Sequence, residues 1–130
     1  MSAAPGGQAP LKMMIVDDSN IMRRRIERSQ QIERLEVVAC AANGREALDM
    51  FQQADPDVVT MDLTMPEMDG IECVEKLVRM KSEVLILVVS ALADKATAVE
   101  AIEKGANGFL CKPFTDRQLN DALHELLADA

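Results

Sequence analysis

Residues 58–61 read VVTM, a short run of aliphatic and β-branched side chains, and Asp62 follows it directly. A short run that is apolar at nearly every position is typical of a strand covered by helices on both faces of a parallel sheet. Similar runs occur on both sides of it along the chain. Together with residues 13–16, 35–39, 84–89 and 109–111, the sequence predicts five such strands.

The segments between these runs have the spacing of amphipathic helices. Residues 21–32 are less periodic, but their charges suit a helix on the surface. The other four segments each have an apolar face with a helical period. These faces are Ala47, Leu48, Phe51 and Ala54; Ile71, Val74 and Val78; Val99, Ile102 and Ala106; and Leu119, Ala122, Leu123 and Leu126.

Helix starts carry a second local signal. Asn43, Asp69 and Thr115 each precede a Glu or Gln by three residues, which is the spacing of a capping box. Asp18 is a candidate cap for the first helix, because acidic caps are common. These signals mark the expected starts of the helices.

Strict alternation of strands and helices predicts an α/β fold, a doubly wound parallel sheet with helices on both faces. Right-handed crossovers leave few topologies, and the common strand order for five strands is 2-1-3-4-5. Ligands bind such folds at the carboxyl ends of the strands. The polar residues directly after the strands are therefore expected to converge: Asp17, Asp18, Asp62, Ser90 and Lys112.

Three carboxylates in one pocket repel one another, and a divalent cation relieves this repulsion. Oxygen ligands together with a phosphoryl group favour Mg²⁺. Lys112 adds a positive charge and Ser90 a hydroxyl, which together provide what phosphoryl transfer requires. Asp62 lies between the acidic pair and Lys112, so we expect it to be the nucleophile that forms an acyl phosphate. Asp17 and Asp18 are better suited to hold the ion.

Composition limits the classes of partner. The chain has 130 residues and a net charge of −8, which argues against nucleic acid and against an anionic membrane surface. Apolar runs fall short of the roughly 20 residues that span a bilayer. Three cysteines without paired spacing favour a reduced, cytoplasmic compartment. We expect a disordered tail over residues 1–11 and one domain over residues 12–130.

Five motifs that occur in order along the chain, next to the predicted strands, resemble those of response-regulator receiver domains. The resemblance covers about residues 12–127, and its fold is the flavodoxin-like sandwich. The chain length resembles the stand-alone, CheY-like members. The motifs are Val16-Asp17-Asp18-Ser19, Met61-Asp62-Leu63 with Met65-Pro66 and Met68-Asp69-Gly70, Ser90-Ala91, Gly105-Ala106, and Lys112-Pro113-Phe114.

The resemblance implies a role for each site residue. Asp62 would be the phosphorylated residue. Asp18, Asp62 and the backbone carbonyl of Thr64 would ligate Mg²⁺, with Asp17 acting largely through water. Lys112 would contact the phosphoryl group.

The resemblance also implies a switch. Ser90 would move toward the phosphoryl group, and Phe109 would turn inward as it does. Phe109 stands where tyrosine is frequent, so the switch there would depend on packing alone. The Lys112–Pro113 bond is expected to be cis.

As a receiver, the chain would be a signalling switch of a two-component system rather than an enzyme. A sensor histidine kinase would supply the phosphoryl group, and a downstream target would bind the face formed by the fourth helix, fifth strand and fifth helix. A flagellar motor switch is one candidate target, and a phosphatase is a further partner. Alternatives are a domain of a larger regulator, a phosphate sink, a phosphorelay intermediate, an unphosphorylated docking module or an aspartyl-nucleophile phosphatase.

Overall fold

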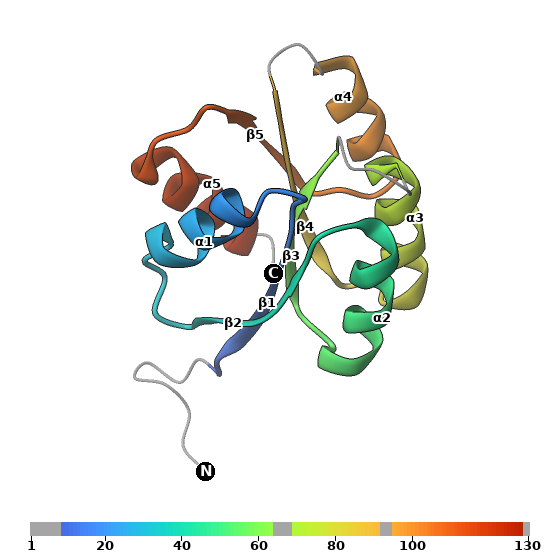
Figure 1. The fold of residues 1–130 in the computed structure, drawn as a ribbon, viewed down its shortest axis with the longest axis horizontal. Coiled ribbons are helices and arrows are strands. Elements are labelled where there is room, and N and C mark those ends of the chain that lie inside the picture. The colour runs from blue at the N-terminus through green and yellow to red at the C-terminus, as the bar shows by residue number, and fades with distance from the viewer. Residues whose placement is uncertain (1–8, 64–68, 92–94, 129–130) are drawn as a thin grey trace.

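A computed structural model describes residues 9–63, 69–91 and 95–128. Within these residues, five parallel strands form one sheet in the order β2-β1-β3-β4-β5, which confirms the predicted topology (Figure 1). The first strand begins one residue before the predicted domain boundary. The strands are β1 (Leu11–Val16), β2 (Leu35–Ala41), β3 (Val58–Asp62), β4 (Leu85–Ala91) and β5 (Gly108–Lys112).

The helices form a layer on each face of the sheet. Figure 1 shows α1 and α5 on one face and α2, α3 and α4 on the other. In the described part of the chain, no helix is long and apolar enough to cross a membrane. The helices are α1 (Asn20–Ser29), α2 (Gly44–Ala54), α3 (Gly70–Met80), α4 (Lys95–Glu103) and α5 (Asp116–Ala128).

The apolar strands bury side chains on both faces. In β1, Met13 and Ile15 lie in the core under α1 and α5, whereas Met14 and Val16 lie in the core under the other three helices. All four are at most 1% exposed. Successive side chains of a strand point to opposite faces, so a strand covered on both sides must be apolar throughout.

The predicted caps hold for three helices. The side-chain oxygens of Asn43, Asp69 and Thr115 each accept backbone N–H groups of their own first turns. The prediction of Asp18 as the cap of α1 is wrong. Ser19 caps this helix, with its Oγ accepting a backbone N–H three residues on at 3.2 Å. The helix begins at Asn20, so Asp18 lies one residue before the cap and belongs to the strand-end cluster.

The predicted apolar face of α4 is also wrong. Val99 and Ile102 are 53% and 42% exposed, and Ala106 lies beyond the end of the helix. The buried side chains are instead Ala98 and Ala101. Small residues let α4 approach its neighbours closely, and the larger apolar side chains are thereby turned to the surface.

An ionic cluster joins α3 to the amino end of the sheet. Nζ of Lys81 lies 3.2 Å from a carboxylate oxygen of Asp57 and 3.2 Å from one of Asp55. The backbone N–H of Lys12 donates to Asp57 at 2.9 Å. Partial burial alone would raise the pKa of Asp57, but the hydrogen bonds from Lys12 and Lys81 outweigh it and hold the pKa below its ordinary value of 3.8.

Asp57→Asn is expected to lower the free energy of unfolding by about 1 kcal/mol at neutral pH. A carboxylate with a lowered pKa stabilises the fold above its ordinary pKa, and this contribution is lost as the pH falls through the folded value. The difference between Asp57→Asn and wild type should therefore shrink in urea unfolding at about pH 3. Asp49→Asn, exposed on α2, is the control. A difference that is the same at both pH values would contradict the ionic explanation.

Candidate functional site

The three predicted carboxylates meet at the carboxyl edge of the sheet. Asp17 and Asp18 follow β1, and Asp62 is the last residue of β3, its parallel neighbour. Each offers an oxygen, and these oxygens lie within 4.8 Å of one another. Asp17 and Asp62 are only 1% and 2% exposed, while Asp18 is open to solvent. The cluster is therefore half buried and reachable from one side.

Lys112 completes the cluster from the far edge of the sheet. It is the last residue of β5, and its Nζ lies 3.1 Å from Oδ2 of Asp17 and 3.7 Å from Oδ1 of Asp62. The Lys112–Pro113 peptide bond is cis, as expected from the resemblance. A buried carboxylate is costly without a partner, so the ammonium group compensates the two aspartates that are shielded from water.

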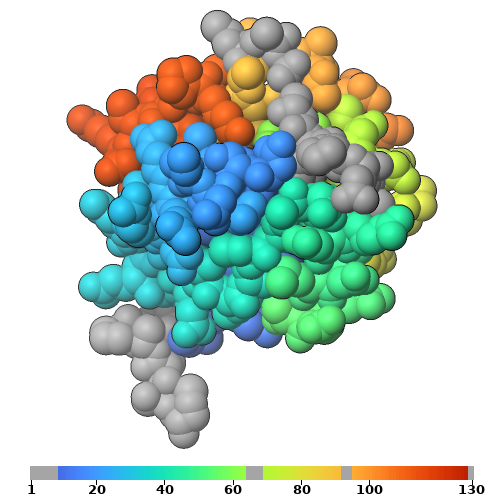
Figure 2. All heavy atoms as spheres, viewed as in Figure 1, coloured from blue at the N-terminus to red at the C-terminus, as the bar shows by residue number. Residues whose placement is uncertain are grey.

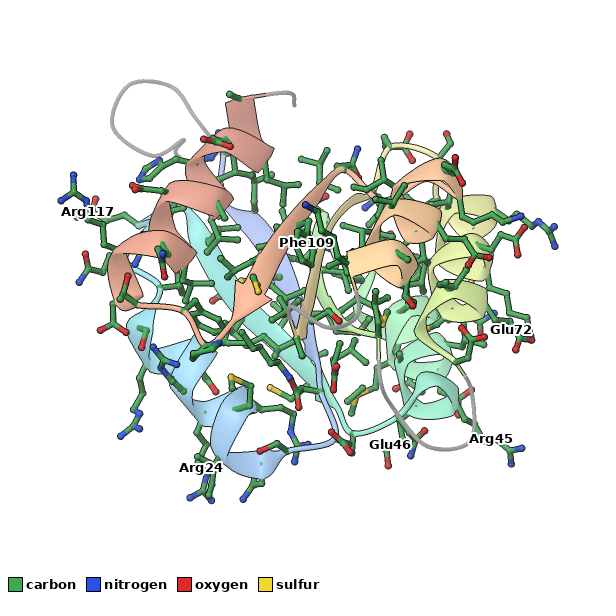
Figure 3. The ribbon with its side chains drawn as sticks, turned by 90° about the horizontal axis from the view of Figure 1, so that it is seen from above. Arg24, Arg45, Glu46, Glu72, Phe109 and Arg117 are labelled. Atoms are coloured by element: carbon green, nitrogen blue, oxygen red, sulfur yellow. The ribbon has the colours of Figure 1, made fainter. Side chains whose placement is uncertain are left out.

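Ser90 lies on β4, the neighbour of the strand that ends at Asp62, and Phe109 lies on β5, the edge strand beyond it. Asp62 pairs in register with Val89, which places the buried Ser90 one residue further along the same edge. Phe109 is half-buried on β5 and packs against the core beside α4 (Figure 3). Thr64 lies outside the described residues, and the movements expected of Ser90 and Phe109 remain predictions.

The donor set fits a hard divalent cation. Asp17, Asp18 and Asp62 carry three negative charges and Lys112 one positive charge, which leaves two negative charges at the cluster. All the offered ligand atoms are carboxylate oxygens, the type that Mg²⁺ prefers. These three residues could therefore hold Mg²⁺ and leave coordination positions for water and a phosphoryl oxygen.

Two arginines of α1 contact the backbone at or next to the site, and neither was predicted from the sequence. Nη1 of Arg23 donates to the backbone carbonyl of Asp17 at 2.6 Å. The guanidinium of Arg25 donates to the backbone carbonyl of Phe114, two residues after Lys112. The only hint in the sequence is the run of three arginines at residues 23–25 in an acidic chain, and such a run is equally typical of a solvent-exposed helix face.

Comparison with known proteins identifies the family of this chain. The profile of the response regulator receiver domain matches residues 13–124. The chain is 39% identical over 115 residues to "Chemotaxis protein CheY" of Listeria monocytogenes, covering 88% of this chain and 97% of that protein. It is 38% identical over 109 residues to "Regulatory protein AtoC" of Escherichia coli, covering 84% of this chain and 23% of that protein.

Solved structures agree with these matches. The receiver domain of AraT, a response regulator from Geobacillus stearothermophilus, aligns with a TM-score of 0.86 at 29% identity, covering 92% of this chain and 94% of that one. The profile spans most of the chain, and the relative from Listeria is similar over nearly its whole length. The chain therefore belongs to the response regulator receiver domain family.

Proposed function

We propose that this protein is a phosphorylation-activated switch of a two-component system and that Asp62 accepts the phosphoryl group. The observation that carries the proposal is the position of Asp62. It is the last residue of β3, buried, grouped with two other carboxylates and 3.7 Å from the ammonium of Lys112. This arrangement suits a nucleophile whose product carries additional negative charge.

The reaction transfers one phosphoryl group. A carboxylate oxygen of Asp62 attacks phosphorus, and the bond from phosphorus to the donor breaks. The donor leaves with the electron pair, as imidazole from a phosphohistidine or as a carboxylate from an acyl phosphate. Lys112 balances charge on the phosphoryl oxygens, and the hydroxyl of Ser90 donates a hydrogen bond to them. Asp17, Asp18 and Asp62 would hold Mg²⁺, which would supply further charge neutralisation.

The face formed by α4, β5 and α5 is our candidate for target binding. Val99 and Ile102 on α4 are exposed apolar side chains, and Phe109 is half-buried on the neighbouring edge strand. Phosphorylation would shift the population toward a form of this face that binds the target, through new contacts of Ser90 with the phosphoryl group. The similarity to a chemotaxis protein makes a flagellar motor switch a candidate target.

Further proposals concern the phosphoryl donor, the phosphatase and the compartment. We infer that a sensor histidine kinase is the donor, that a phosphatase can end the signal, and that the exchange takes place in the cytoplasm, since Cys40, Cys73 and Cys111 are free thiols. The match to part of AtoC supports the alternative of a domain within a larger regulator. Phosphate-sink and phosphorelay roles use the same chemistry and differ only in the recipient.

Incubation of the wild-type protein with acetyl phosphate and Mg²⁺ is expected to add the mass of one phosphoryl group. Removal of the metal with EDTA should suppress this gain, because the carboxylate cluster then repels the incoming phosphate. Intact mass spectrometry with and without EDTA makes the test. An unchanged mass in the presence of Mg²⁺ would refute the proposal, and repeated turnover of a phosphomonoester would support a phosphatase instead.

A further inference from the structure

The three consecutive arginines of α1 face in different directions. Arg24 is exposed and points away from the molecule (Figure 3), whereas Arg23 and Arg25 are half-buried. Arg23 contacts the loop after β1, which carries Asp17 and Asp18, and Arg25 contacts the loop that follows Lys112 at the end of β5. We propose that Arg25 is a positioning residue that holds Lys112 in place for phosphoryl transfer; this inference rests on the proposed function.

Arg25 makes three contacts with the loop that follows Lys112. Its guanidinium donates a hydrogen bond to the carbonyl oxygen of Phe114. The same group lies over the Phe114 ring, 4.5 Å from its centroid, and its Nη2 is 3.6 Å from Oδ1 of Asp116. Phe114 itself is 4% exposed and belongs to the core under α1 and α5. Arg25 thus joins the loop to α1 by a hydrogen bond, a cation–π contact and an ion pair.

The position of the Lys112 ammonium depends on this loop. Lys112 ends the edge strand β5, which pairs with β4 on one side only. The backbone at the end of β5 fixes where its long, flexible side chain starts, so a shift of the loop that follows would move the ammonium group relative to the carboxylates. α1 and α5 lie against each other (Figure 2), and Arg25 bridges them next to the start of α5. Without Arg25, the loop would lose these three contacts and would be held to α1 by the burial of Phe114 alone.

Arg23 contacts the partner of Lys112 in its ion pair. Its Nη1 donates to the carbonyl oxygen of Asp17, and Asp17 is the carboxylate 3.1 Å from Lys112. α1 therefore contacts the backbone of Asp17 through Arg23 and the loop that follows Lys112 through Arg25. The separation of Lys112 from the carboxylates is set by α1 as well as by the sheet.

Two measurements on Arg25→Gln test the proposal, and they should move in opposite directions. The rate of phosphoryl uptake from acetyl phosphate should fall about tenfold, because small misplacements of a positioned group are costly. The affinity for Mg²⁺, measured by calorimetry on the metal-free protein, should rise about threefold, because a less firmly held ammonium competes less with the ion. Arg25→Lys keeps the positive charge and a hydrogen-bond donor. Its uptake rate and its Mg²⁺ affinity should both lie closer to the wild-type values than those of Arg25→Gln.

Arg24→Gln, on the same turn and exposed, is the matched control and should behave as wild type. A purely structural role for Arg25 would lower uptake and Mg²⁺ affinity together, or change neither while lowering stability, and either result would overturn the proposal. If Arg25→Gln fails to fold, Arg25→Lys tests the proposal instead. Its phosphoryl uptake should be slightly slower than that of wild type and its Mg²⁺ affinity slightly higher. Wild type that takes up no phosphoryl group would refute the proposed function, and the Mg²⁺ titrations would still report on Arg25.

Discussion

The Asp62→Asn protein is expected to take up no phosphoryl group under conditions in which the wild type is fully labelled, a loss of more than about a thousandfold in rate. The amide has nearly the size and shape of the carboxylate but lacks the negative oxygen that attacks phosphorus. The fold should remain intact. Asp62 lies close to two other carboxylates, so the neutral amide also relieves repulsion at the cluster.

Intact mass after incubation with acetyl phosphate and Mg²⁺ measures this loss, and circular dichroism checks the fold. Asp49→Asn removes an exposed carboxylate from α2 and should be labelled like wild type. Equal labelling of Asp62→Asn and wild type would place the acceptor elsewhere, with Asp17 and Asp18 as the next candidates.

The Gly70→Ala protein is expected to lose about 3 kcal/mol of unfolding free energy and to take up phosphoryl groups more slowly. A Cβ at Gly70 would lie 2.6 Å from the Cα of Leu63 and 2.9 Å from the carbonyl oxygen of Asp62. Both are backbone atoms, which cannot rotate away. The start of α3 must therefore move off the end of β3, and this displacement far outweighs the roughly 1 kcal/mol that alanine gains over glycine in a helix.

Gly108→Ala is the matched control. A Cβ at Gly108 would meet only the ends of flexible side chains, Leu87 Cδ1 at 3.3 Å and Leu126 Cδ1 at 3.8 Å. This variant should lose less than about 1 kcal/mol in urea unfolding and should be phosphorylated normally. If the two alanine variants were equally stable, close backbone contact at Gly70 would not be what limits the helix position.

The local patterns of the chain were sufficient for most of the architecture. Apolar runs such as residues 58–62 identify strands covered on both faces, and their alternation with helices leaves few topologies. The acids at the strand ends then converge because parallel strands end at one edge of the sheet, as Asp17, Asp18 and Asp62 do. The capping spacing of Thr115 likewise depends only on residues within one helical turn.

Helix rotation was where the local patterns failed. Val99 and Ile102 share a helical period and were expected to face the core, but α4 buries Ala98 and Ala101 instead. A period identifies residues that lie on one side of a helix, but which side faces the sheet depends on how closely the helix can pack. In α4, small side chains determine that choice.

Side-chain period and chain connectivity were enough to predict the five strands and the acids at their ends, and they left only a few possible strand orders. The same reasoning brings Lys112 to the acidic edge, but its direct contact with Asp17, 95 residues away, and the hydrogen bond from Arg25 to the carbonyl of Phe114, 89 residues away, are visible only in the folded structure. Both contacts depend on the three-dimensional paths of long side chains between separate elements. Those paths are set by packing around them, which no local pattern in the chain encodes.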